Sequence, residues 1–278
     1  MTGPPTPRPR ALWLRRRALC KTSLLPLRVI ALAAILLALA GPAQTAGDGS
    51  AGSAERPLAG RLIVIDPGHH PRNLAHAGRI ARPVDAGTLI KACDTVGTAT
   101  NGGYTEARHN LDVARRLRAI LRRRGARVVL THNGRKPRFG PCITERAAIA
   151  NRLGADVALS IHADGHLGPG RGFHIIHPAR VEGLTDDISI ASLRLARQVR
   201  RAFARRTGLP RATYAGRNGL HARTDIGGLN LSDVPKVLVE TANMRNVTDA
   251  RLLTRSRFRQ REAAGLANGL TAFLSTSD

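Results

Sequence analysis

Several histidine and carboxylate side chains stand where short apolar runs of the sequence end. His69 follows closely after the apolar run 62–65, and His162 and Glu240 end two similar runs further along the chain. Such runs are typical of strands buried on both faces, and the carboxyl ends of such strands line the ligand crevice of open α/β sheets. We therefore expect these three side chains at one edge of the molecule, together with Glu106, which begins the helix after a long loop.

This combination of residue types fits metal-assisted hydrolysis. Two imidazoles and one carboxylate are enough protein ligands for a catalytic zinc ion, with the fourth position left to water. A second carboxylate close by can act as the base. One zinc ion per chain is therefore expected.

Each of these residues also has a simpler interpretation, because a single histidine or glutamate at a strand end is more often a hydrogen-bonding loop residue than a ligand. The convergence of four such residues favours a site. His70, His174 and His177 are rival ligands. Asp66 and Asp164 could hold imidazole N–H groups or could equally be turn residues.

The elements that must position these residues alternate in type along the chain. Apolar spacing predicts helices over 106–124, 144–153 and 188–203, and a last helix marked by Leu266, Leu270, Phe273 and Leu274. Strands are predicted over 62–65, 128–131, 157–161, 172–176 and 237–239. The alternation predicts an α/β fold with a mostly parallel sheet covered on both faces. The segment 67–105, with six glycines, exceeds a minimal α/β unit, and loops of this length are usually functional or poorly ordered.

Two of the three cysteines fall in the domain. Cys20 lies in the N-terminal segment, whereas Cys93 and Cys142 remain as an even pair. A disulfide between them is the simplest expectation in an exported protein, and it would tether the long loop beside the metal crevice. Two metal thiolates or two free thiols are the alternatives, although the spacing is not of the CxxC type.

The N-terminal segment 1–46 has the layout of a signal peptide. Seven basic residues and no acidic ones precede an apolar run over 29–40, and cleavage is expected after Ala43 or Ala46. A membrane anchor is the alternative, but the run is shorter than the ~20 residues that a spanning helix needs. Arg15-Arg16-Arg17 also resembles a twin-arginine signal, so the export route stays open. Residues 47–60 are expected to form a flexible lead-in, and residues 61–275 the domain.

The composition of the 278-residue chain limits the classes of function. The formal charge is +25, but only four of the 44 basic residues are lysine, and 42% of the residues are hydrophobic. This excludes disorder as a description of the whole chain. The charge suggests weak affinity for anionic wall polymers, and a non-catalytic polymer-binding domain is one alternative function. With 3% aromatic residues and no recognisable motif, specific nucleic-acid binding is not expected.

The motifs, in their order along the chain, resemble the zinc-dependent N-acetylmuramoyl-L-alanine amidases of the Amidase_3 family. They are Ile63-Val64-Ile65-Asp66-Pro67-Gly68-His69, Glu106 at the start of a helix, the segment 144–151 with Arg146 and Asn151, Ser160-Ile161-His162-Ala163, and Val234-Pro235-Lys236-Val237-Leu238-Val239-Glu240. The resemblance covers about residues 61–273, and the chain is similar to the small secreted single-domain members of actinobacteria. Two departures, His70 in place of a glycine and the segment 241–246, concern substrate fit and not the ligands.

The resemblance implies a three-layer α/β/α domain with about six strands. It implies that His69, Glu106 and His162 are the zinc ligands and that Glu240 is the catalytic glutamate. The implied reaction is hydrolysis of the amide between N-acetylmuramic acid and L-alanine in peptidoglycan or its muropeptide fragments. A zinc peptidase acting on stem peptides is a second alternative. An exported monomer without a membrane span after cleavage is expected.

Overall fold

The structure, a computed structural model, describes residues 56–276. The predicted signal peptide and most of the predicted lead-in therefore lie outside the described residues. Residues 57–60, which were expected to belong to the flexible lead-in, instead form a turn in which Leu58 is fully buried. The Leu58 N–H donates to the carbonyl of Arg124 at 2.9 Å, so the folded domain begins a few residues before position 61.

The centre of the domain is a six-stranded sheet, which confirms the expected strand number. Its order is β4-β1-β5-β8-β6-β7, and all neighbours are parallel except β6 and β8, which are antiparallel. The strands are β1 (Leu62–Pro67), β4 (Arg127–Leu130), β5 (Val157–Asp164), β6 (His174–Pro178), β7 (Leu220–Arg223) and β8 (Lys236–Asn243). The short strand β7 was not predicted, because its sequence Leu-His-Ala-Arg contains no apolar run.

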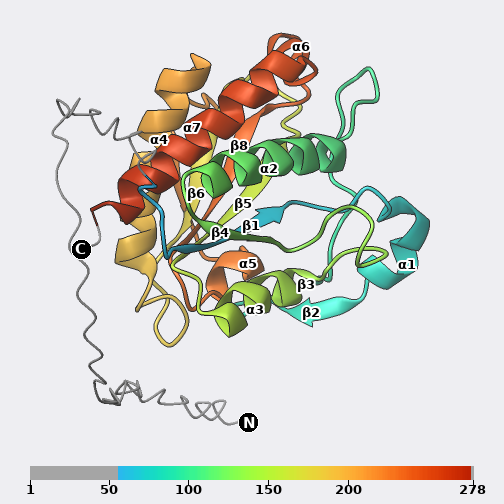
Figure 1. The fold of residues 1–278 in the computed structure, drawn as a ribbon. Helices are drawn as coiled ribbons and strands as arrows, with labels where there is room; N and C mark the ends of the chain where they lie inside the picture. Colours follow the sequence, from blue (N-terminus) through green and yellow to red (C-terminus); the bar gives the residue numbers. More distant parts are fainter. Residues whose placement is uncertain (1–55, 277–278) are drawn as a thin grey trace, which may run out of the picture. The chain divides into compact units, whose positions relative to one another are not determined.

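Helices cover both faces of this sheet, so the predicted three-layer α/β/α fold is confirmed (Figure 1). The larger layer consists of α2 (Glu106–Arg123), α4 (Ser189–Thr207) and α7 (Ser256–Leu274). The smaller layer consists of α3 (Ile143–Leu153) and the single turn α5 (Gly227–Asn230), and α6 (Val247–Leu253) leads into α7. Within residues 56–276, no helix combines the length and the apolar character needed to cross a membrane.

Alternation along the strands separates the main core from the site. Ile63 and Ile65 of β1 point into the large core beneath α2, α4 and α7, whereas Val64 packs in a smaller cluster with Ala150 of α3. Because successive side chains of a strand face opposite sides, Asp66 shares the face of Val64. Asp66, Ser160 and the cavity described below lie on this face.

The long segment 67–105 has secondary structure of its own. It contains the 3₁₀ turn η1 (Leu74–His76), the short helix α1 (Ala77–Ile80) and an antiparallel hairpin of β2 (Pro83–Asp85) and β3 (Ile90–Ala92). A disulfide joins Cys93, directly after β3, to Cys142, directly before α3, which confirms the predicted pairing. The hairpin is thereby tied to the helix on the site's face of the sheet.

One predicted strand is displaced by two residues at both ends. The strand expected over 172–176 is β6 over His174–Pro178. Gly172 has a φ of +97°, which is outside the strand region, and its N–H donates to a carboxylate oxygen of Asp249 at 2.7 Å. The N–H of Gly172 is therefore bonded to the side chain of Asp249 and does not form the hydrogen bond to a neighbouring strand that a longer β6 would need.

Candidate metal centre and active site

Three ligand-type side chains from different elements meet at the carboxyl edge of the sheet. His69 follows β1, Glu106 is the first residue of α2, and His162 lies near the end of β5. One ligand atom from each residue lies within 4.8 Å of the other two. The structure thus brings together the three residues that the sequence analysis expected, and they could hold one metal ion.

The carboxylate of Glu106 lies between the two imidazoles. Its Oε1 is 2.9 Å from Nδ1 of His162, and its Oε2 is 3.1 Å from Nε2 of His69. Backbone N–H groups of Ala163 and Thr98 donate to the same two oxygens, at 3.2 and 2.9 Å. The carboxylate is therefore held in one orientation by backbone from two separate segments.

His69 is oriented by the segment that follows the disulfide. Its Nδ1 lies 3.1 Å from both the carbonyl oxygen and the Oγ1 of Thr95, and 3.5 Å from Oδ1 of Asp94. An imidazole that donates from Nδ1 to such acceptors leaves Nε2 free to bind a metal. His69 also has a φ of +59°, a left-handed conformation that non-glycine residues rarely adopt, and such strain tends to occur at functional sites.

Two glycines allow the ligands to approach so closely. A Cβ atom at Gly68 would lie 2.2 Å from the His162 ring, so the backbone before His69 is in direct contact with that imidazole. A Cβ atom at Gly97 would lie 2.7 Å from both Oε2 of Glu106 and the His69 ring, and Gly97 has a φ of +76°. Any side chain at either position would intrude on the cluster.

The electrostatics of the cluster favour a positive charge. Burial disfavours the imidazolium form of His69, but the neighbouring carboxylates of Glu106 and Asp94 outweigh burial and raise the pKa of His69 to about 10. Burial likewise works against an ionised Glu106, yet the two histidines hold the pKa of Glu106 well below its ordinary value. The centre therefore stabilises added positive charge, which a proton or a divalent cation can supply.

Glu240 lies beside this cluster and is not part of it. In the sheet register Glu240 of β8 is paired with His162 of β5, and on its other side with His174 of β6. Paired residues on neighbouring strands point to the same face. Within the described residues Oε2 of Glu240 is buried without a hydrogen-bond partner, and burial, Glu106 and Asp164 raise the pKa of Glu240 well above its ordinary value.

Burial without a partner and an elevated pKa are the properties of a carboxyl group suited to exchanging protons. A base is most effective when its pKa lies near the working pH, and burial is a common means of raising a glutamate to that range. The structure therefore offers two kinds of carboxylate at one edge: Glu106 among the imidazoles and Glu240 next to them.

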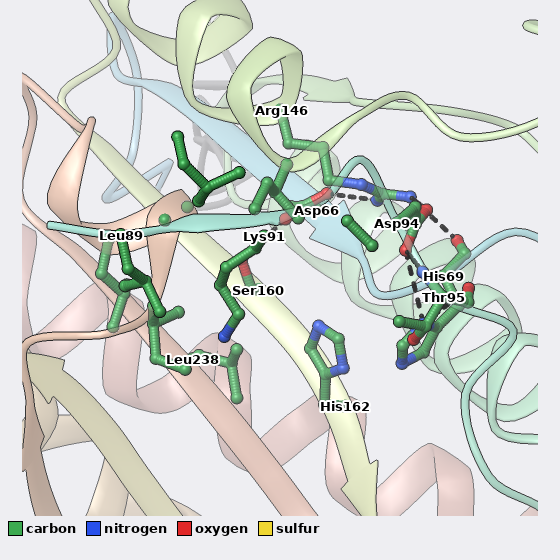
Figure 2. A pocket seen from close by; sticks show the side chains of 17 residues that line it. Asp66, His69, Leu89, Lys91, Asp94, Thr95, Arg146, Ser160, His162 and Leu238 are labelled. Atoms are coloured by element: carbon green, nitrogen blue, oxygen red, sulfur yellow. Dashed lines mark hydrogen bonds and ion pairs between the residues drawn. The ribbon is translucent and has the colours of Figure 1, made fainter. Parts of the chain in front are cut away.

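A cavity of about 410 Å³ opens beside the imidazoles of His69 and His162. Asp66 and Ser160 lie in its polar part, where Arg146 joins Asp66 to Asp94 (Figure 2). The guanidinium of Arg146 donates to Oδ1 of Asp66 at 2.7 Å and to Oδ2 of Asp94 at 2.8 Å. All three side chains are at least 94% buried, so this ion pair network is a fixed part of the site.

Asp66 does not take the imidazole-partner role, which is one of the two roles that the sequence left open. Its carboxylate accepts hydrogen bonds from Arg146, Thr131 and Ser160 and contacts neither imidazole of the cluster. The structure gives the role of orienting an imidazole to Asp94 and Thr95, because the segment after Cys93 passes next to His69 while Asp66 points toward α3. Neither residue was singled out from the sequence, although adjacency to a predicted disulfide cysteine was an available signal.

The rival histidines lie outside the three-residue cluster. His70 is buried against the ring of His132, and its Nδ1 accepts from the N–H of Arg72. His174 and His177 lie on β6, beyond Glu240 as seen from His162. Among residues 56–276 the cluster of His69, Glu106 and His162 is the one group of three or more such side chains close enough to share a metal ion. Asp164 accepts a hydrogen bond from the N–H of Gly165, as a turn residue does.

Fold and site together define the class: a three-layer α/β/α domain whose sheet edge carries a candidate metal centre with a buried carboxylic acid beside it. Residues 63–272 match the Amidase_3 family, described as N-acetylmuramoyl-L-alanine amidase. The chain belongs to this family.

Individual relatives agree with this assignment over most of their length. The N-acetylmuramoyl-L-alanine amidase Rv3717 of Mycobacterium tuberculosis is 38% identical over 228 residues, which cover 82% of this chain and 92% of the relative. AmiA of Escherichia coli is 26% identical over 249 residues, which cover 78% of each chain. The crystal structure of Ami1 from Mycobacterium smegmatis superposes with a TM-score of 0.74 at 39% identity, over 79% of this chain and 99% of that one.

Proposed function

We propose that this chain is a zinc-dependent N-acetylmuramoyl-L-alanine amidase, which hydrolyses the amide between N-acetylmuramic acid and L-alanine in peptidoglycan or its fragments. The observation that supports this most directly is the meeting of His69, Glu106 and His162, with Glu240 paired to His162 in the sheet. The family and its relatives supply the substrate class.

The residues present fit a zinc ion. Two imidazoles and one carboxylate match the donor set of catalytic zinc sites, and three protein ligands leave a coordination position for a non-protein ligand. His69 would bind through Nε2, because its Nδ1 is engaged by Thr95. Zinc bound there would act as a Lewis acid that polarises the scissile carbonyl and makes water more acidic.

Glu240 would act first as the general base and then as the general acid of the reaction. Its carboxylate takes a proton from the attacking water as the new carbon–oxygen bond forms at the amide carbon. It then gives this proton to the departing nitrogen of L-alanine, since an amine leaves poorly as an anion. The products are a free muramic acid carboxyl group and the amine of the stem peptide, and Glu240 returns to its starting state. Its anchoring on the rigid strand β8 keeps it at the edge of the site.

The test is a digest of purified muropeptides followed by mass analysis. Wild-type protein loaded with zinc should release intact stem peptides with a free L-alanine amine. Removal of zinc by a chelator should stop this release and added zinc should restore it. Cleavage within the stem peptide would instead identify a peptidase, and binding to wall polymers without any product would identify a polymer-binding domain. His162→Ala should lose zinc and activity together, and full zinc occupancy in that variant would refute the ligand assignment.

The site of action follows from the same proposal. We infer export of the chain to the wall space through the predicted signal peptide, with the folded domain, which begins a few residues before position 61, as the working part. The disulfide between Cys93 and Cys142 supports this, because such bonds persist in oxidising compartments. Without the seven basic residues of the segment 1–46, the formal charge of +25 falls to about +18, which still supports a weak additional affinity for anionic wall polymers. A fusion of residues 1–46 to a reporter protein, followed through cell fractionation, would test export. Sizing of the purified domain would test the expected monomer.

A further inference from the structure

The cavity beside the metal ligands has walls of a distinct character. The β2–β3 hairpin contributes Leu89 and Ile90 to the lining. The neighbouring segment around α5 contributes Ile226 and Leu229, and β8 contributes Leu238. Its lining contains no phenylalanine, tyrosine or tryptophan. Burying sugar hydroxyls against such walls would cost their hydrogen bonds to water, whereas aliphatic peptide groups gain from it. The cavity therefore suits the stem peptide and not the glycan.

One cation of the hairpin points into this apolar space. Lys91 lines the cavity (Figure 2). Its ammonium donates to the carbonyl oxygen of Asp225 at 3.0 Å. This is its one hydrogen bond among residues 56–276. An ammonium has three N–H donors, so two remain for a ligand.

The carboxylates near Lys91 are already engaged by other cations. The Asp225 carboxylate receives two hydrogen bonds of 2.6 Å from the guanidinium of Arg223. The two carboxylates within the cavity, Asp66 and Asp94, are both bound by Arg146. The positive charge of Lys91 is thus available to an entering anion.

We infer that Lys91 binds a carboxylate of the stem peptide and makes the enzyme prefer substrates with a free carboxylate on the residue after L-alanine. This inference rests on the proposed function. The scissile amide lies at the metal ligands, so the peptide that follows it extends into the adjoining cavity, which the hairpin and α5 both line. A charge-assisted hydrogen bond in an apolar cavity is stronger than one in water.

The experiment uses two synthetic N-acetylmuramoyl dipeptides that differ only in the second residue, which carries a carboxylate in one and a carboxamide in the other. The zinc-loaded wild type should cleave the carboxylate form with a kcat/KM higher by roughly tenfold or more. Lys91→Met should bring the two values close together, and Lys91→Arg should restore much of the difference. Calorimetric titration of the zinc-depleted protein with the two free dipeptides should show the same preference and the same losses.

Thr88→Ala is the matched control, because Lys91 could also act by anchoring the hairpin. The Thr88 hydroxyl donates to the carbonyl of Thr224 at 2.6 Å, and Thr88 does not line the cavity. Loosening the hairpin in this way should change both substrates equally. If Lys91→Met also lowers both equally, or leaves the preference of the wild type unchanged, the inference is wrong. If the wild type cleaves neither compound, the proposed function fails, while the calorimetric preference still decides the role of Lys91.

Discussion

The Asp94 carboxylate connects His69 to the ion pair network beneath the site. Its Oδ1 lies 3.5 Å from Nδ1 of His69, and its Oδ2 accepts from Arg146 at 2.8 Å and from Asn73 at 3.0 Å. The imidazole proposed to bind zinc therefore lies next to a carboxylate that Arg146 and Asn73 both hold in position.

Loss of the Asp94 carboxylate should weaken zinc binding. Asp94→Asn keeps the size of the side chain but removes the negative charge facing Nδ1 of His69. Changes of this kind typically cost about 10- to 100-fold in metal affinity. A competition titration with a chromophoric chelator measures the zinc Kd directly. Glu145→Gln is the control, because that carboxylate pairs with Arg152 at the surface. An unchanged Kd in Asp94→Asn would show that Thr95 alone orients the imidazole.

The disulfide should act on both stability and the metal. It closes a loop over a sequence separation of 49 residues, for which chain entropy gives a contribution of roughly 2–4 kcal/mol. Replacing Cys93 and Cys142 by alanine should lower the free energy of unfolding by about this amount in urea titrations. Because Asp94 follows Cys93 directly, the zinc Kd should rise as well. A double variant that is less stable but binds zinc as tightly as the wild type would separate the two effects.

The layers, the parallel strands and the edge that gathers His69, His162 and Glu240 could be predicted from sequence, because buried runs and strand ends are local patterns. The roles of Glu106 and Glu240 came from a family resemblance and remain proposals. The part that Asp94 plays was not predicted, since it depends on how 67–105 folds back on the sheet. The hairpin and the disulfide set that path, and of these the disulfide was the available signal.

Long-range pairings also explain why Asp66 does not orient an imidazole. Asp66 stands three residues before His69, which made it a reasonable partner for an imidazole. In the structure Arg146, 80 positions away, donates to it at 2.7 Å. The fully buried Lys236 has its Nζ 3.9 Å from the same carboxylate. A buried carboxylate is stabilised by the cations that the fold brings to it, and a sequence pattern does not specify these.

Glu240→Gln should separate proton transfer from metal binding. The substitution keeps size and polarity but removes the proton acceptor, which should lower turnover of muropeptides by roughly 10²- to 10⁴-fold. Zinc content should stay near that of the wild type, because Glu240 lies outside the cluster of His69, Glu106 and His162. Elemental analysis beside the rate measurement checks both parts. Loss of zinc would make Glu240 a ligand and Glu106 the better candidate for the base.

The stability of the domain should fall between about pH 6.5 and pH 4 in part through His132. This buried imidazole lies with Nε2 2.9 Å from the carbonyl of Pro67, while Nδ1 accepts from the N–H of Gly134, so the neutral form is the one that fits. Burial and the nearby Arg146 lower the pKa of His132 to about 4. Because the unfolded chain takes up the proton near the ordinary pKa of 6.5, it binds more protons than the folded protein across this range. The stabilising contribution of neutral His132 is therefore fully present above the ordinary pKa of 6.5 and is lost as the pH falls toward 4.

A non-titrating replacement tests this linkage. His132→Gln keeps an N–H group for Pro67, and the variant should be less stable than the wild type at pH 7. Because glutamine cannot bind a proton, the free energy of unfolding of the variant should decline less steeply on acidification. One proton contributes at most about 1.4 kcal/mol per pH unit to the free energy of unfolding. Urea titrations at several pH values measure that slope. Arg135→Gln is the control. It removes a charge in the same loop that does not titrate in this pH range, so it should leave the slope unaltered. A decline in His132→Gln as steep as in the wild type would assign the acid sensitivity to other groups.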